Sequence, residues 1–150
     1  MSDAAEVRHR VAELLAGQPL AVLATHAQGQ PYTSLVAFAA TEDLRHLLFA
    51  TTRATRKFAN LTADERVALL VDNRSNQESD FHDAMAATVM GRAAEVPDGE
   101  RQALLAIYLG RHPYLRDFVA SPTCAFLKVT VEKYVVVNRF QQVMELHVTP

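Results

Sequence analysis

The first segment of the chain has the hydrophobic spacing of a helix that lies with one side against a core. Its apolar positions recur at i, i+4, i+7 and i+8, and the charged residues between them fall elsewhere. Gly17 and Pro19 follow and are typical helix-ending residues. The pattern predicts an amphipathic helix over residues 3–16, whose apolar face consists of Val7, Val11, Leu14 and Leu15.

After Pro19 the pattern changes to short apolar runs separated by turn residues, which is typical of strands. The first two runs flank a Gly-containing turn at residues 27–31 and form a hairpin in this prediction. The continuous run 66–72 predicts a central strand covered on both faces, and Gly91 indicates a bulge or a close backbone approach. About eight strands are expected, over residues 20–25, 32–38, 44–51, 66–72, 87–96, 124–131, 133–140 and 143–148.

Helical segments interrupt the strands at three places. Thr62 and Glu65 have the spacing of a capping box and predict a short helical turn. A second helix is expected from Pro97 to Gly110, followed by a short segment over 112–119, whereas residues 73–83 are polar and predict a long loop. The whole chain, 1–150, is therefore predicted to be a single, mainly β (α+β) domain: an antiparallel β-barrel with helices packed outside it.

Composition narrows the classes of function. The chain is 49% hydrophobic and 21% charged, which is typical of a globular protein, and its formal net charge of -2 gives no bulk attraction to nucleic acid or anionic membranes. No apolar run reaches the roughly 20 residues of a membrane-spanning helix. A single cysteine and an acidic start without a signal-peptide pattern lead us to expect a cytoplasmic protein.

Several motifs that mark catalytic or metal sites do not occur. The five glycines are far apart, so no Gly-rich loop can surround a phosphate, and there is no nucleophile elbow or zinc-binding pattern. The six histidines are scattered, which predicts no metal site, and Cys124 sits in an apolar run that predicts burial. Any anion must therefore be held mainly by side chains.

One basic cluster offers such side chains. Arg53, Arg56 and Lys57 are spaced i, i+3, i+4, which places them on one face if the segment is helical. They would lie near a helix N-terminus, where free N–H groups also favour an anion. A solvated basic helix face is the alternative interpretation. Three neighbouring hydroxyl groups could add donors, from Thr51, Thr52 and Thr55.

The order of these segments resembles the pyridoxamine 5'-phosphate oxidase-like superfamily of FMN-binding split β-barrels. The resemblance covers roughly residues 10–96, and the C-terminal segment 134–140 looks like the closing strands of the same fold. The matching pieces are residues 23–25, 29–36, 48–52, 55–61 and 65–71.

The resemblance implies a cofactor site for FMN. The strand that carries Thr33, Ser34, Leu35 and Val36 would lie along the isoalloxazine ring. The strand end Thr51-Thr52 would approach the ribityl chain and phosphate, and Thr55-Arg56-Lys57 matches the phosphate-binding step of the family. Further flavin contacts, often across a dimer interface, would come from the polar loop through Asn73, Arg74 and Asn76.

The family pattern also implies a homodimer with two flavins at the subunit interface and a small-molecule redox substrate. The chain departs from true pyridoxamine-phosphate oxidases because it is shorter and lacks their Arg-x-His pattern near the C-terminus, so vitamin B6 oxidation is not expected. It has no Trp to stack on a flavin, which leaves Tyr32, Phe38 or Phe140 for that contact.

The leading hypothesis is an FMN-dependent oxidoreductase in which the flavin carries the redox chemistry, so no catalytic side chain is assigned. A non-catalytic flavin carrier or electron-transfer protein would have the same cofactor residues. The same barrel could also bind F420 or haem, and for haem His112 or His147 would have to reach the pocket. The last alternative is an interaction domain without a small ligand.

Overall fold

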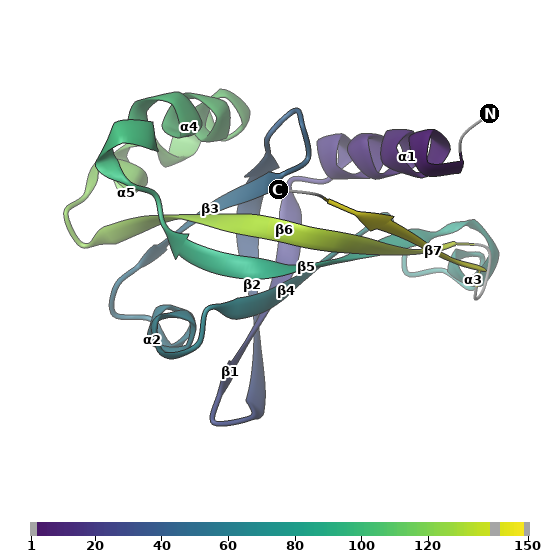
Figure 1. Ribbon diagram of the computed structural model, residues 1–150, viewed down its shortest axis with the longest axis horizontal. Helices are drawn as coiled ribbons and strands as arrows, with labels where there is room; N and C mark the ends of the chain where they lie inside the picture. The colour runs from purple at the N-terminus through teal and green to yellow at the C-terminus, as the bar shows by residue number, and fades with distance from the viewer. Residues whose placement is uncertain (1–2, 139–141, 149–150) are drawn as a thin grey trace.

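A computed structural model describes residues 3–138 and 142–148 of the chain, and it consists of one sheet with helices around it (Figure 1). The strands are β1 Leu20–Ala27, β2 Gln30–Ala40, β3 His46–Thr52, β4 Arg66–Asp72, β5 Met85–Glu95, β6 Cys124–Asn138 and β7 Gln142–His147. The helical segments are α1 Asp3–Gly17, α2 Arg56–Ala63, α3 Asp80–Asp83, α4 Asp98–Arg111, the 3-10 turn η1 Pro113–Leu115 and α5 Arg116–Ala120.

The sheet closes on itself. Its strand order is β3-β2-β1-β4-β5-β6-β7, and an additional pairing between β3 and β6 joins the two ends of the first six strands into a barrel. All pairings are antiparallel, which confirms the predicted antiparallel barrel with outer helices. The central position predicted for 66–72 is confirmed because β4 lies between β1 and β5. Its residues are buried alternately rather than on both faces.

The last barrel strand differs from the prediction, which placed two strands where the structure has one. β6 runs unbroken through Glu132 because its outer edge changes partner, from β3 along residues 124–130 to β7 along 133–138. Seven strands are therefore described where about eight were predicted. Phe140, in the predicted strand 133–140, lies outside the described residues. Gly91 marks the predicted bulge: an added Cβ would lie 2.3 Å from the Thr130 carbonyl oxygen.

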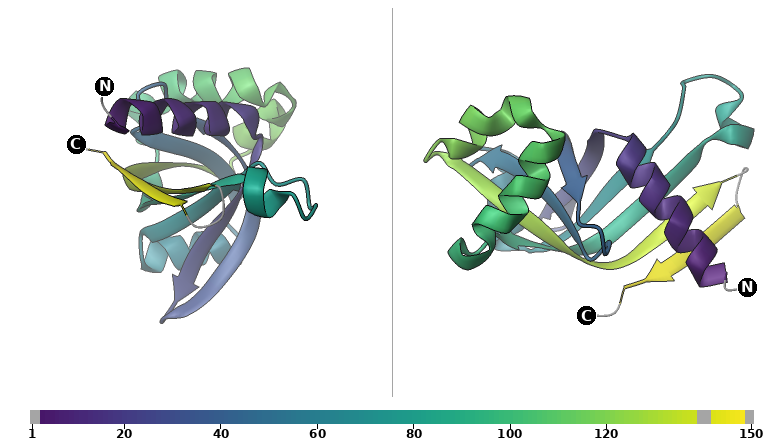
Figure 2. Two further views of the ribbon diagram at one scale, coloured as in Figure 1. Left: turned by 90° about the vertical axis from the view of Figure 1, so that its right-hand side faces the viewer. Right: turned by 90° about the horizontal axis from the view of Figure 1, so that it is seen from above.

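Two apolar layers hold the helices on the barrel. The interior is filled by strand residues such as Leu23 and Phe49, both fully buried, and α1 covers one opening with Val11 and Leu15. Outside the barrel, α4 packs on β2 and β3 and α5 on β6, and this second cluster is built around Tyr108 (Figure 2). Each fully buried aliphatic side chain contributes roughly 1.5–3 kcal/mol, so both layers are substantial.

Two predicted helix boundaries were wrong. The capping box at Thr62 is not used, because α2 begins earlier: the Thr55 hydroxyl accepts a hydrogen bond from the Phe58 N–H and caps the helix there. Thr62 lies in the last turn and donates to the Phe58 carbonyl at 2.8 Å. Likewise α4 does not end at Gly110 but continues to Arg111, which the further hydrogen bond from the His112 N–H to the Tyr108 carbonyl allows.

Candidate functional site

The barrel is open on one side, between β2 and β3. β2 and β3 pair only over three residues of each strand, from Phe38–Phe49 to Ala40–Leu47. Beyond Phe49, β3 pairs with β6 alone. In the described residues, β2 pairs with β1 alone from Gln30 to Ala37, so one edge of its backbone has no neighbouring strand. The β1–β2 hairpin projects away from the rest of the barrel as a result (Figure 1).

Tyr108 of α4 and His112, the residue that follows the helix, hold the point where the strands separate. The Tyr108 hydroxyl donates to the Ala37 carbonyl at 3.1 Å, and His112 Nε2 lies 2.7 Å from the Phe38 carbonyl oxygen. A carbonyl only accepts, so Nε2 carries the proton of this buried imidazole. Burial raises the pKa of Tyr108, which therefore stays a protonated donor. Tyr108 thus satisfies a carbonyl on the edge of β2 that β3 leaves, and His112 satisfies one on the opposite edge, where Pro19 has no N–H to donate.

A cavity of about 270 Å³ lies in this opening. It brings together six of the residues predicted from the sequence to bind the cofactor. The other walls are apolar surfaces of β2, β3, α4, η1 and α5, including Leu115 and Phe118. The six predicted residues at the cavity are Leu35, Val36, Thr51, Thr52, Thr55 and Lys57.

The hydroxyl groups at the end of β3 form a connected set. Thr51 Oγ1 and Thr55 Oγ1 are 2.9 Å apart, and Thr55 Oγ1 also donates to the Thr52 carbonyl at 3.0 Å. This arrangement fixes the turn between β3 and α2 and explains why the helix begins at Arg56. The Thr52 hydroxyl has no partner within the described part of the chain and is left to contact a ligand.

Positive charge without a counter-ion lies at the start of α2. Lys57 is half-buried and lines the cavity, while Arg56 is exposed with its guanidinium 5.9 Å from the centre of the Tyr32 ring. Neither forms an ion pair with any described carboxylate, and the backbone N–H groups of both have no acceptor among residues 3–138 and 142–148. Cations, free N–H groups and the helix dipole together favour an anion here.

Arg53 does not belong to this set. It precedes α2, so the prediction that three cations share one helix face was wrong. Its guanidinium forms two hydrogen bonds to the Glu95 carboxylate, at 2.5 and 2.9 Å. These bonds raise the pKa of Arg53 and lower the pKa of Glu95, and they neutralise the Arg53 charge locally. The partner lies 42 positions away, which sequence spacing cannot reveal.

The other predicted ring-side residues follow β2 with alternating orientation. Leu35 is 64% exposed and Thr33 is exposed, whereas Val36 is buried. Ser34 Oγ is buried without a described partner, and the side chain does not line the cavity. Of the stacking candidates, Phe38 is wholly buried in the core and cannot face a ligand, Tyr32 is exposed, and Phe140 lies outside the described residues.

Asn73, Arg74 and Asn76 lie in a loop at the other end of the barrel, beside α3, and do not approach the cavity of their own chain (Figure 1). Asn73 Oδ1 accepts from the Met85 N–H at 2.7 Å, and Arg74 pairs with Asp72 at 3.0 Å. Asn76 has a φ of 62° and donates its N–H to Asp80. Four backbone or hydroxyl donors converge on that carboxylate, so the predicted loop is ordered and includes α3.

The α4 side of the site could hardly be recognised from the sequence. Tyr108 fell within the helix predicted from Pro97 to Gly110, and Leu115 and Phe118 fell within the short segment predicted over 112–119. His112, a conditional haem ligand in the prediction, is buried with both ring nitrogens hydrogen-bonded within the protein, to Phe38 and to Tyr114. The exposed His147 pairs with Glu145 on β7 and does not line the cavity.

Two kinds of feature are absent from the described residues, a metal-binding cluster and a membrane-spanning helix. No three His, Cys, Asp or Glu side chains among residues 3–138 and 142–148 gather in a way that could hold a metal ion. Within the same residues, no helix combines the length and the apolar character that crossing a membrane requires.

Solved structures share this fold. A heme binding protein from Mycobacterium smegmatis superposes with a TM-score of 0.82 at 17% identity, over 98% of this chain and 59% of its own length. This chain thus spans about three fifths of that relative. A FAD-binding protein from Mesorhizobium loti gives 0.69 at 20% identity, covering 86% of this chain and 90% of that one. General Stress Protein 26 from Bacillus anthracis gives 0.71 at 16%, covering 95% and 99%.

These identities are low, so the superpositions establish a common fold and nothing about a shared ligand. A search of curated proteins finds no match to this chain. A family model provides the assignment: the model for pyridoxamine 5'-phosphate oxidase matches residues 7–138, which include the whole barrel from β1 to β6. The chain therefore belongs to the pyridoxamine 5'-phosphate oxidase family.

Proposed function

We propose that the chain binds FMN in the opening between β2 and β3 and acts as an FMN-dependent oxidoreductase on a small molecule. One observation carries the proposal: the cavity ends at a helix N-terminus where, in the described residues, two cations have no counter-ion and the first two N–H groups have no acceptor. An uncompensated cluster of this kind is stabilised by a bound phosphate.

The phosphate end of the site would be formed by the turn between β3 and α2. Lys57 would supply a point charge inside the cavity, and Arg56 would approach from its exposed rim. The Thr52 hydroxyl is close enough to the same helix start to donate to phosphate or ribityl oxygens. Thr55, whose hydroxyl proton is given to the Thr52 carbonyl, would hold the turn in place. Because no Gly-rich loop is present to bind the phosphate through successive backbone N–H groups, the side chains of Lys57, Arg56 and Thr52 would bind it instead.

The ring end would lie along β2. From Gln30 to Ala37 this strand offers a backbone edge that β3 does not use. An isoalloxazine ring carries hydrogen-bonding groups on its edge, and an unpaired strand edge offers donors and acceptors at regular spacing. Leu35 on β2 and the apolar wall from α4 and α5 would cover its flat faces.

A second copy of the chain would complete the site. The cavity of about 270 Å³ is slightly smaller than typical ligand sites of about 300–1,000 Å³. The loop residues Asn73, Arg74 and Asn76 cannot reach it within one chain, so in the proposal they act on the flavin bound to the partner. Exposed apolar side chains on the projecting hairpin, Leu20, Tyr32 and Leu35, are available to be buried in such a dimer.

The protein would contribute to the chemistry by positioning the flavin. FMN, when bound, supplies hydride and electron transfer. The described residues that line the cavity include no Asp, Glu, His or Cys. Lys57 would be engaged by the phosphate and the Tyr108 hydroxyl is held by the Ala37 carbonyl, so the proposal assigns no general acid or base. The lining residues would instead orient the ring, fix its phosphate and exclude water from one face, and the substrate would enter from the open side.

Haem is a weaker candidate for this site than a phosphate-bearing flavin. One neighbour in fold binds haem and another binds FAD, so the fold alone does not choose between them. The described lining of the cavity has no His, Cys or Met to serve as an axial ligand, and the Tyr108 hydroxyl is held by the Ala37 carbonyl. F420 also carries a phosphate and is distinguished from FMN by the experiment below.

The proposal is tested by purifying the protein, recording its visible spectrum and identifying the released chromophore by mass spectrometry. We expect FMN, at one molecule per chain. A colourless protein that takes up no FMN on incubation would refute the cofactor assignment, and release of F420 or haem would replace it. Steady-state assays with NADH and NADPH then separate the enzyme from a carrier: an FMN-bound protein that oxidises neither with any acceptor is not a reductase.

A further inference from the structure

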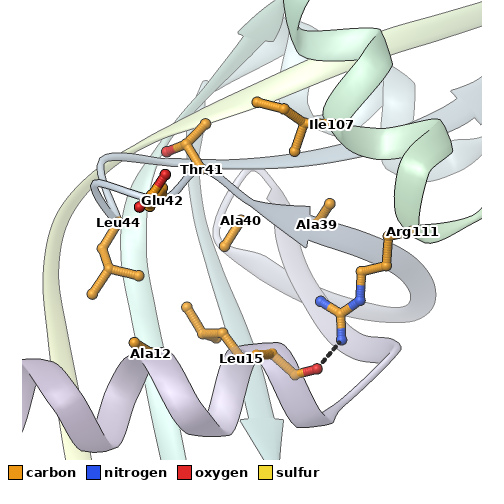
Figure 3. Close-up of a pocket in the computed structure, with 10 residues that line it drawn as sticks. Ala12, Leu15, Ala39, Ala40, Thr41, Glu42, Leu44, Ile107 and Arg111 are labelled. Carbon is orange, nitrogen blue, oxygen red and sulfur yellow. Dashed lines mark hydrogen bonds between the residues drawn. The ribbon is translucent and has the colours of Figure 1, made fainter.

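A second hollow, of about 450 Å³, lies between α1, α4 and the turn from β2 to β3 (Figure 3). It is separate from the flavin cleft, shares no residue with it, and has no role in the proposed function. Its floor is almost entirely aliphatic, and we call it the α1–α4 groove. The apolar floor consists of Ala12, Leu15, Ala39, Ala40, Leu44 and Ile107.

One cation lies at the end of this apolar floor. Arg111 extends from α4 to the C-terminal end of α1, where its Nη2 donates to the Ala16 carbonyl at 3.1 Å and to the Gln18 carbonyl (Figure 3). The other terminal nitrogen is turned toward the side on which Leu15 and Ala40 lie. Neither Nη1 nor Nε has an acceptor among the described residues.

The charge of Arg111 is not compensated. Its guanidinium is half-buried and lies 5.0 Å from the centre of the Phe38 ring, and burial lowers the pKa of Arg111 with no carboxylate opposing that effect. Five other arginines of the chain differ from Arg111 because each is paired with a carboxylate, whereas Arg56 and Arg101 also lack one in the described residues. These pairs are Arg10–Glu6, Arg53–Glu95, Arg66–Asp64, Arg74–Asp72 and Arg92–Glu65.

A structural role explains only part of this arrangement. The two bonds from Nη2 cap the C-terminus of α1, where a cation is favourable, and the Phe38 ring accounts for one face of the guanidinium. The donors on its remaining edge point to no protein atom that could accept them. These donors are accessible from the groove, and an anion seated there would accept from them and offset the guanidinium charge.

We propose that the α1–α4 groove is a binding site for a small monoanion with an apolar body, such as a medium-chain carboxylate. The carboxylate would accept from Arg111, and the chain would lie on the floor between Leu15 and Ile107. Glu42 is the acidic residue of the groove and lies near Thr41, across Ala39 and Ala40 from Arg111 (Figure 3). Glu42 determines which way round the ligand binds, since its negative charge repels an anionic group at its own end of the groove.

The probe for this site is octanoate, with octylamine as a ligand of equal length and opposite charge. Isothermal titration should give saturable octanoate binding with a dissociation constant below about 1 mM and much weaker binding of octylamine. Arg111→Gln should weaken octanoate binding about tenfold or more, because it removes a charge-assisted hydrogen bond. Arg116→Gln, on the exposed surface of α5, has the same change in charge and should leave binding within about twofold.

A second variant keeps the proposal testable if Arg111→Gln fails to fold. Ala12→Leu fills the floor from α1 without touching Arg111, and it should weaken octanoate binding by at least the same factor. No octanoate binding to the wild type would overturn the proposal. So would equal binding of octanoate and octylamine, or octanoate binding to Ala12→Leu with wild-type affinity.

Discussion

Lys57 and Arg53 lie four positions apart and carry the same charge, yet their surroundings differ. Arg53 is held by the two oxygens of Glu95, whereas Lys57 lines the cleft and pairs with no carboxylate in the described residues. An anion that enters the cleft would therefore interact with Lys57 and gain little from Arg53. This contrast supplies a matched pair of variants.

Lys57→Gln should weaken FMN binding about tenfold to a hundredfold and leave riboflavin binding nearly unchanged, because only FMN carries the phosphate. Fluorescence titration of the flavin-free protein measures both affinities. Arg53→Gln, the control with the same change in charge, should affect FMN and riboflavin equally and only slightly. Equal losses of the two ligands in Lys57→Gln would show that the lysine is structural.

The sequence predicted the cleft residues unevenly for a physical reason. Thr51, Thr52, Thr55 and Lys57 are close together in the chain, so their spacing places them near one helix start. The wall from α4 lies more than 50 positions away, and only the tertiary packing of Tyr108 against β2 brings it there. Long-range partners of this kind have no local signal.

At the scale of elements, the opening of the barrel depends on α4. Tyr108 donates to the Ala37 carbonyl on the edge of β2 that β3 leaves. His112, just after α4, contacts the Phe38 carbonyl on the opposite edge, where Pro19 has no N–H to donate. Without these donors the carbonyls would be buried and unsatisfied where the two strands part.

Tyr108→Phe should lower the free energy of unfolding by about 1–3 kcal/mol, since the Ala37 carbonyl would lose its donor. Urea denaturation followed by circular dichroism measures this change. Tyr32→Phe is the control, because that side chain is 41% exposed and its hydroxyl has no hydrogen-bond partner in the described residues, so it should change the free energy of unfolding by less than about 0.5 kcal/mol. Equal stabilities for Tyr108→Phe and the wild type would mean that α4 does not hold the strands.

Gly91→Ala should destabilise the barrel by about 1–3 kcal/mol, because the new methyl group would collide with the Thr130 carbonyl of β6. Gly99→Ala in α4 is the matched control: nothing lies within 4 Å of its added Cβ, and a helical alanine should be neutral or stabilising. Thermal unfolding compares the two. A Gly91→Ala variant as stable as Gly99→Ala would contradict the close approach described at the bulge.

The elements themselves were largely predictable, because the hydrophobic period distinguishes strands from helices. The errors concern element boundaries that depend on contacts formed only in the folded protein. β6 passes through Glu132 without a break since β3 and β7 share its edge, and α2 begins at Arg56 because Thr55 caps it. Residues 66–72 read as a strand covered on both faces, but the barrel buries only alternate positions.

At the scale of the whole molecule, the account requires two copies of the chain. The loop with Arg74 and the cleft with Lys57 lie at opposite ends of one chain, so a flavin that contacts both must lie between subunits (Figure 1). We therefore expect sedimentation to give twice the chain mass of 16.6 kDa, with one flavin per chain. A monomer that binds flavin fully would refute the shared site.

Mixing two defective variants tests the sharing directly. Lys57→Gln and Arg74→Gln should each weaken FMN binding, but in a mixed dimer one site would combine the intact Lys57 of one chain with the intact Arg74 of the other. Co-expression of the two should therefore restore tight binding at one of the two sites of each mixed dimer. If both residues acted within one chain, titration would find no tight site in the mixture.

The central claim is that the start of α2 binds the phosphate of FMN, and the most direct measurement is the ratio of FMN to riboflavin affinity in the wild-type protein. With Arg56, Lys57 and two free N–H groups available, we expect FMN to bind at least about a hundredfold more tightly than riboflavin at low salt. Equal affinities for the two flavins would contradict the account.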